Sequence, residues 1–155
     1  MNTKTSDERR ARSTELIDHM LAERRQLLSL LFQITDLGGH ELEESERELF
    51  DEFCQVLVDY IAAGHFGLYS RISEGKERRK AVAELAARIY SSIEASTEVA
   101  LAFNERFDPN KSEDMDFTDI EEQLSTLAEH ITSRIELEDQ LINEMLQRSV
   151  VAEAG

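Results

Sequence analysis

The residues of this chain that could do chemistry are its four histidines, its one cysteine and a large excess of carboxylates. A di-iron centre in a helical bundle requires Glu-x-x-His, which puts a carboxylate and an imidazole on one helix face. None of the four histidines has a glutamate three residues before it. His19 and Glu23 have the spacing of one helix face, but a single pair of this kind arises by chance in glutamate-rich helices. We therefore predict no metal centre and no cofactor.

The sequence offers no support for nucleophilic catalysis either. Cys54 lies on the apolar face of the second segment between Phe53 and Leu57 and has no basic activator near it in the sequence, which favours a core residue over a nucleophile. No Ser–His–Asp arrangement, phosphate loop or glycine-rich nucleotide fingerprint is present. We expect a protein that is not an enzyme.

Four polar residues fall on helix faces that are otherwise apolar. Glu138 continues the apolar spacing of the last helical segment, and His65 follows the core face of the second. Glu23 and Arg24 occupy the inner half of the first segment. Since a buried carboxylate needs partners, these residues predict a small polar network in the centre of a bundle. A phase drift of one turn would instead put Glu138 at the surface, and the sequence leaves both alternatives open.

A second group of residues indicates recognition of another protein. Asp59, Ala62, Ala63 and Phe66 share one stripe if the helix continues through Gly64. A glycine inside a helix costs about 1 kcal/mol relative to alanine, so close packing or a site should compensate for it. An exposed aromatic ring beside a carboxylate and two small residues would anchor a partner helix. The alternative is that Phe66 turns back into the core.

Four amphipathic segments must position these residues. Apolar side chains recur at three- and four-residue steps over about 5–36, 45–64, 76–106 and 118–145, with a further turn or two after the second segment through Tyr69 and Ile72. Gly38-Gly39 and Gly75 would end the first two segments, and capping boxes at Ser45–Glu48 and Thr118–Glu121 would begin the second and fourth. The third has a predicted break near Ser96-Thr97.

These segments predict an all-α fold, an up-down four-helix bundle with long helices and extra short helical turns. The length of 155 residues predicts a single domain over 1–155, with frayed ends at about 1–6 and 151–155.

The net charge of −16 restricts the partners. Direct binding of nucleic acid is disfavoured because phosphates require a basic face. An acidic surface favours solubility and association with basic partners. No apolar run approaches the ~20 residues of a membrane span, and the N-terminus lacks the apolar region of a signal peptide. We expect a cytoplasmic protein that does not bind membranes.

Three blocks of the sequence resemble the Rsd/AlgQ family, the bacterial regulators of RNA polymerase sigma D. The most specific block covers residues 51–69 and reads DEFCQVLVDYIAAGHFGLY. The first-helix block covers residues 16–28 and reads LIDHMLAERRQLL, and the last-helix block covers residues 137–142 and reads LEDQLI. The chain departs from the family at one place: the first-helix motif commonly has Arg-Trp after the aspartate, and this chain has His19-Met20.

The resemblance implies a helical bundle that binds the C-terminal, promoter-recognition region of the primary sigma factor. Such binding reduces the use of that factor by RNA polymerase and favours alternative sigma factors as growth slows. The positions that the resemblance implies for partner contact are Asp59, Ala62 and Phe66, to which we add Asp18 of the first-helix block. Some members also bind the phosphocarrier protein of the sugar phosphotransferase system, but no residue here carries a signature for that partner.

The alternative, from a different functional class, is a helical bundle that binds a metal or a small ligand. Its site would be formed by His19, Glu23, His65 and Glu138. The net charge favours the sigma factor, since a promoter-reading domain is basic and an acidic bundle can cover it. The sequence leaves the oligomeric state open.

Overall fold

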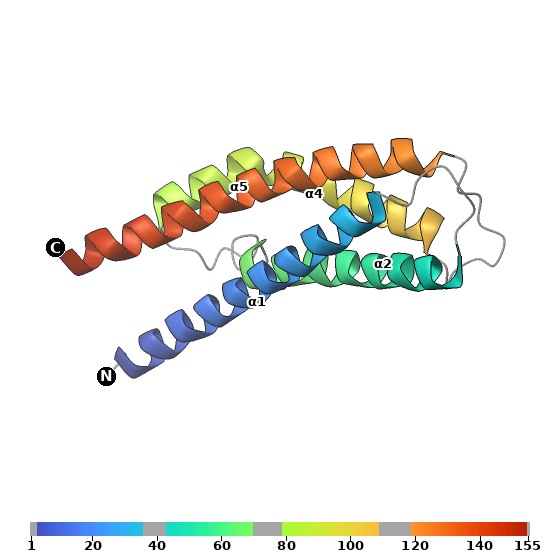
Figure 1. Ribbon diagram of the computed structural model, residues 1–155. Helices are drawn as coiled ribbons and strands as arrows, with labels where there is room; N and C mark the ends of the chain where they lie inside the picture. Colours follow the sequence, from blue (N-terminus) through green and yellow to red (C-terminus); the bar gives the residue numbers. More distant parts are fainter. Residues whose placement is uncertain (1–2, 36–42, 70–78, 109–118, 155) are drawn as a thin grey trace.

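The computed structural model describes residues 3–35, 43–69, 79–108 and 119–154, and the side chains of 14–35, 43–69, 79–108 and 119–145. Within these ranges every regular element is helical, as predicted. The elements are α1 (Thr3–Thr35), α2 (Glu44–Gly64), the π-helical turn η1 (His65–Tyr69), α4 (Lys80–Phe107) and α5 (Ile120–Ala154). The long helices alternate in direction, so the up-down arrangement is confirmed (Figure 1).

The four long helices pack as two antiparallel pairs. α1 lies along α2, and α4 lies along α5 (Figure 1). The two pairs meet mainly where α2 packs on α4, while α1 contacts α5 over a short stretch. Because α1 is covered mainly on one side, Leu16 and Leu28 of its apolar stripe remain partly exposed.

Two predicted boundaries are corrected by local hydrogen bonds. The N-cap of α2 is Glu43, two residues before the predicted Ser45, and its backbone N–H donates to Oε1 of Glu46 at 3.0 Å. α4 has no break at Ser96-Thr97. The hydroxyls of Ser96 and Thr97 donate to the carbonyl oxygen of Ile93, at 2.6 and 3.1 Å, so both side chains bond to the preceding turn while the helix continues.

The first and last helices reach close to the chain ends: α1 begins at Thr3 and α5 continues to Ala154. The predicted boundaries at Gly38-Gly39, Gly75, Lys76 and Thr118 lie outside the described residues.

An aromatic cluster fills the core where α2 begins and α4 ends. Phe50, Phe53, Phe103 and Phe107 lie with ring centroids between 4.9 and 6.5 Å apart. Cys54, the residue after Phe53, is also buried, as predicted for a core cysteine. The bundle is therefore apolar at this end.

Two glycines let η1 approach its neighbours closely. A Cβ atom at Gly67 would lie 3.0 Å from the carbonyl oxygen of Leu16, so η1 lies directly against the α1 backbone. A Cβ atom at Gly64 would lie 3.2 Å from Nη2 of Arg134. The backbone nevertheless stays helical from Gly64 into His65. Close packing is therefore what compensates for the helix propensity that these glycines lose.

Candidate functional site

A buried polar cluster lies in the middle of the bundle. Glu138 and Arg134, both on α5, are 0% and 1% exposed. The inward alternative for Glu138 is therefore the one that the fold adopts. Oε1 of Glu138 accepts hydrogen bonds from Nε of Arg134 at 3.0 Å and from the hydroxyl of Tyr60 on α2.

Arg134 also joins α5 to α4. Its Nη1 donates to Oγ1 of Thr97 at 2.7 Å, to Oγ of Ser96 at 3.1 Å and to the carbonyl oxygen of Ile93 at 3.4 Å. The hydroxyls of Ser96 and Thr97 therefore have two functions. Each donates a hydrogen bond to the carbonyl oxygen of Ile93 within α4 and accepts one from the Arg134 guanidinium. A fork of fixed donors suits Arg134 to this bridging role.

Arg24 completes the cluster from α1. Its Nη2 lies 3.6 Å from Oε2 of Glu138, which is an ion pair without a hydrogen bond, and its Nη1 donates to Oδ1 of Asp139 at 2.7 Å. Glu138 thus contacts α1 through Arg24, α2 through Tyr60 and α4 through Arg134. One carboxylate links all four long helices.

Burial controls the protonation of the cluster. Burial raises the pKa of Glu138, while Arg134, Tyr60 and Arg24 oppose that shift. The pKa of Tyr60 is raised by burial and by the charge of Glu138, and the pKa of Tyr69 is raised by the same two causes. For Arg24, burial alone would lower the pKa, but Asp139 and Glu138 together raise it. The tyrosines are therefore held neutral and the guanidinium charged.

The structure brings together only part of the predicted polar centre. Arg24 and Glu138 meet as predicted, but His65 is exposed on η1, and Glu23 pairs with His19 at 3.8 Å nearer the surface. The π-helical turn after Gly64 directs His65 outward and Tyr69 inward.

Sequence reasoning missed four members of the cluster. They are Arg134, Tyr60, Ser96 and Thr97. A signal for Arg134 was present, since it lies three residues after the buried Ile131 and four before Glu138, on the same helix face.

The predicted contact residues gather in a groove between α1 and α2. Asp59, Ala62, Ala63 and Phe66 line it together with Leu16, His19 and Glu23, and we call it the Asp59–Phe66 groove. The Phe66 side chain is 66% exposed, so it does not turn back into the core. Asp18 is exposed on α1 but is not among the residues that line the groove.

No metal site is formed by the candidate ligands. Among the described side chains, no group of three His, Cys, Asp or Glu residues is close enough to hold a metal ion. His19 and Glu23 lie in the groove, His65 lies on η1 and Glu138 lies in the core, so the set proposed for a metal or ligand is divided among three places. Among the described helices, none is both long and apolar enough to cross a membrane.

Comparison with known proteins decides the family. The model of the family described as "Regulator of RNA polymerase sigma(70) subunit, Rsd/AlgQ" matches residues 1–146. The chain belongs to the Rsd/AlgQ family. This family consists of sigma-factor regulators and not of enzymes, in agreement with the prediction that the chain is not an enzyme.

Relatives named "Regulator of sigma D" share most of the length of this family member. The relative from Yersinia enterocolitica is 34% identical over 136 residues, which cover 84% of this chain and 80% of the relative. That from Yersinia pseudotuberculosis is 34% identical over 152 residues, covering 92% and 88%. That from an Enterobacter species is 30% identical over 147 residues, covering 94% and 88%. No solved structure matches the chain.

The departure from the usual family motif at His19-Met20 has a clear structural place. Met20 is fully buried, and its sulfur lies 3.6 Å from the position of a Cβ atom at Gly64. His19 is exposed and lines the Asp59–Phe66 groove. In this Rsd/AlgQ protein the two residues therefore lie in the core beside the polar cluster and in one wall of the groove.

We predict that Glu138→Gln lowers the free energy of unfolding by about 3 kcal/mol, because Arg134 and Arg24 lose their shared carboxylate in a buried site. Unfolding in urea measures this change, and Glu136→Gln, at an exposed position of the same helix, is the matched control. A loss below about 1 kcal/mol would show that the carboxyl group is already neutral in the folded protein.

We also predict that stability falls as the pH rises above about 10, where an unfolded tyrosine ionises. The folded pKa values of Tyr60 and Tyr69 are raised, so their contribution is complete below the unfolded pKa and is lost as the pH rises toward the folded values. Urea unfolding between pH 9 and pH 11 measures the slope, and Tyr60→Phe should reduce it. A slope that is unchanged in both Tyr60→Phe and Tyr69→Phe would contradict this assignment.

Proposed function

We propose that this protein binds the C-terminal, promoter-recognition region of the primary sigma factor in the cytoplasm and reduces its use by RNA polymerase, favouring alternative sigma factors. The observation that carries the proposal is the exposed Phe66 ring, which lines a groove together with Asp59 and the small side chains of Ala62 and Ala63. Membership of a family of sigma(70) regulators supports it.

The Asp59–Phe66 groove has the composition of a protein-binding hot spot. A largely exposed phenylalanine supplies apolar area, and Ala62 and Ala63 leave room for an approaching side chain. The close approach at Gly67 holds η1 against α1, so that Leu16 forms the facing wall. Phe66 is therefore presented from rigid helices, which reduces the entropy lost on binding.

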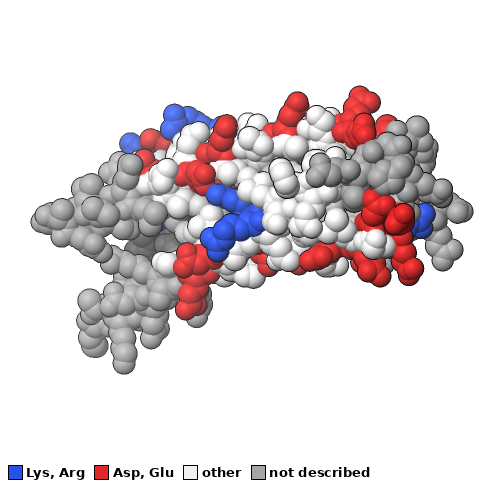
Figure 2. Space-filling view, in the orientation of Figure 1, with Lys and Arg blue, Asp and Glu red and all other residues white. Residues whose placement is uncertain are grey.

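The charge of the chain suits a partner that reads DNA. A promoter-reading domain is basic because it lies on phosphates, and this chain carries a net charge of −16. Figure 2 shows carboxylates along the upper and lower edges of the drawn face, with fewer basic side chains, some of them near its middle. Attraction between the acidic chain and the basic partner speeds their encounter, while contacts in the apolar groove stabilise the complex. A sigma factor covered in this way cannot present the same surface to DNA.

We predict that Phe66→Ala and Asp59→Ala each weaken binding to the sigma factor's C-terminal domain by about 1–3 kcal/mol. Phe66→Ala removes the aromatic anchor and Asp59→Ala removes a carboxylate beside it. Isothermal titration calorimetry of the full chain with that domain, at low and at physiological salt, measures both changes.

Two variants control for loss of an exposed ring and loss of an exposed charge. Phe32→Ala removes a ring that is 75% exposed on α1 outside the groove, and Glu129→Ala removes an exposed carboxylate on α5. Both should bind as the unchanged chain does, apart from a small charge effect at low salt. Absence of binding by the unchanged chain at tens of micromolar would reject the proposed function. Unchanged affinity of both Phe66→Ala and Asp59→Ala, with the fold intact, would place the interface elsewhere.

A further inference from the structure

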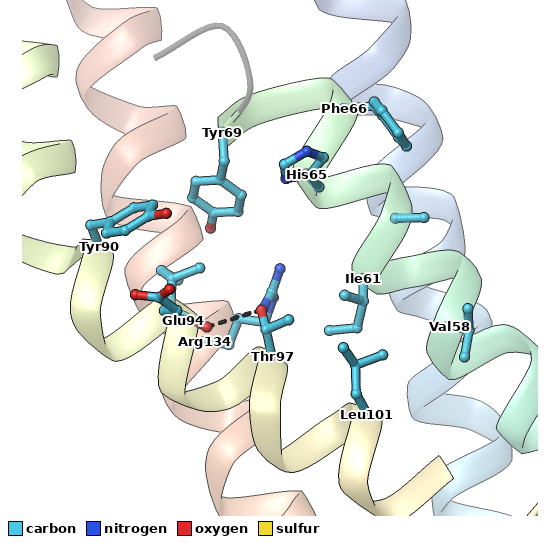
Figure 3. A pocket seen from close by; sticks show the side chains of 12 residues that line it. Val58, Ile61, His65, Phe66, Tyr69, Tyr90, Glu94, Thr97, Leu101 and Arg134 are labelled. Atoms are coloured by element: carbon cyan, nitrogen blue, oxygen red, sulfur yellow. Dashed lines mark hydrogen bonds between the residues drawn. The ribbon is translucent and has the colours of Figure 1, made fainter. Parts of the chain in front are cut away.

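A second pocket lies on the other side of Phe66, between α2, η1 and α4, with α5 beneath it (Figure 3). Its volume is about 380 Å³, in the range of small-molecule sites. It shares Ala62 and Phe66 with the Asp59–Phe66 groove but opens over α4. The residues that line this pocket and not the groove include Ile61, Tyr69, Tyr90, Glu94, Leu101 and Arg134.

Two unused hydrogen-bond donors lie at the inner end of this pocket. Nε and Nη1 of Arg134 are bonded to Glu138 and to α4, whereas Nη2 forms no hydrogen bond with the described residues. Tyr69 is only 7% exposed, and within the described part of the chain its hydroxyl has no hydrogen-bond partner. Figure 3 shows the Tyr69 hydroxyl and the Arg134 guanidinium pointing into the same space.

Two guanidinium groups and one carboxylate are buried near this inner end. Arg134 and Arg24 contribute two positive charges, and Glu138 contributes one negative charge. The carboxylate that compensates Arg24 is Asp139, whose side chain is 51% exposed and lies on the α1 side. Arg134 is thus paired with Glu138, and its unused Nη2 and the neutral Tyr69 hydroxyl are the two donors that an anion would meet at the inner end. The carboxylate that lines the pocket, that of Glu94, lies at an exposed position of α4.

The walls of the pocket are apolar and aromatic. Ile61, Ile93 and Leu101 supply aliphatic surface, and Tyr69 and Tyr90 supply rings. A ligand that uses both features has a compact apolar body and one anionic acceptor group. An ionised carboxylate can accept from the guanidinium and from the phenol together.

We propose that this pocket binds a small organic carboxylate, with the carboxylate at Arg134 and Tyr69 and an aromatic or branched aliphatic body against α2 and α4. A ligand of this kind uses the two donors that the fold leaves without partners. The site is formed by this chain alone, so the proposal stands or fails independently of sigma-factor binding.

The test is a titration of the full, 15N-labelled chain with phenylacetate, followed by amide shifts in two-dimensional NMR spectra. Phenylacetamide, which has the same shape without the charge, is the matched probe. We expect saturable shifts at residues of η1 and of α4 with a dissociation constant of about 1 mM or lower, as for a ligand of this size. Phenylacetamide should bind at least about ten-fold more weakly, because it lacks the charge-assisted bonds.

Variants then locate the site without disturbing the buried cluster. Tyr69→Phe should weaken phenylacetate about ten-fold by removing one donor. Leu101→Trp should abolish binding by filling the mouth of the pocket, whereas Leu28→Trp, at a partly exposed position of α1 outside it, should leave binding unchanged. Each variant is first checked for an unchanged urea midpoint.

Three results would overturn the proposal. The first is the absence of saturable shifts up to about 10 mM phenylacetate, which would mean that the pocket receives a partner's side chain or remains open. The second is equal binding of phenylacetate and phenylacetamide. The third is undiminished binding in Leu101→Trp with a dispersed, folded spectrum.

Discussion

The structure depends on the compensation of one buried carboxylate. Glu138 is completely inaccessible to solvent at the centre of four helices, and leaving it without partners would be strongly unfavourable. Its partners come from α1, α2 and, through Arg134, α4. Among the described residues, Oε2 of Glu138 has only the ion pair with Arg24, so the directional constraint on the helices comes from the bonds that Oε1 accepts from Tyr60 and Arg134. The aromatic cluster at the other end adds apolar burial without that directional constraint.

The surface features follow from this fixed centre. Tyr60 anchors the last turns of α2, and Gly64 lets Arg134 approach the point where α2 becomes η1. The π-helical turn then directs Phe66 outward and Tyr69 inward. The groove that holds Asp59 and the pocket above Arg134 are therefore two sides of one positioned segment. A regulator that must present a rigid face to a partner gains from a polar core that sets the angle of that face.

The all-helical fold, the antiparallel order and the core face of each helix could be predicted from apolar periodicity, because burial at three- and four-residue steps dominates local structure. Glu138 and Arg24 could be nominated for the same reason. The role of Arg134 could not be assigned, because a long cationic side chain on an apolar face is usually expected to extend to solvent. The outward turn of His65 depends on one extra residue in a π-helical turn, which has no periodic signature. The N-cap of α2 at Glu43 was missed because we assigned the capping pair to Ser45 and Glu48, whereas Glu43 and Glu46 form it.

The central claim is that the polar core holds α2 and η1 so that Phe66 and Asp59 form the partner surface. Amide hydrogen exchange of the full chain, with and without the C-terminal domain of the primary sigma factor, tests it most directly. The account predicts new protection concentrated in residues 16–23 of α1 and 59–67 of α2 and η1, with little change along the outer face of α5. Protection confined to α5, with exchange around Phe66 unchanged in the complex, would contradict it.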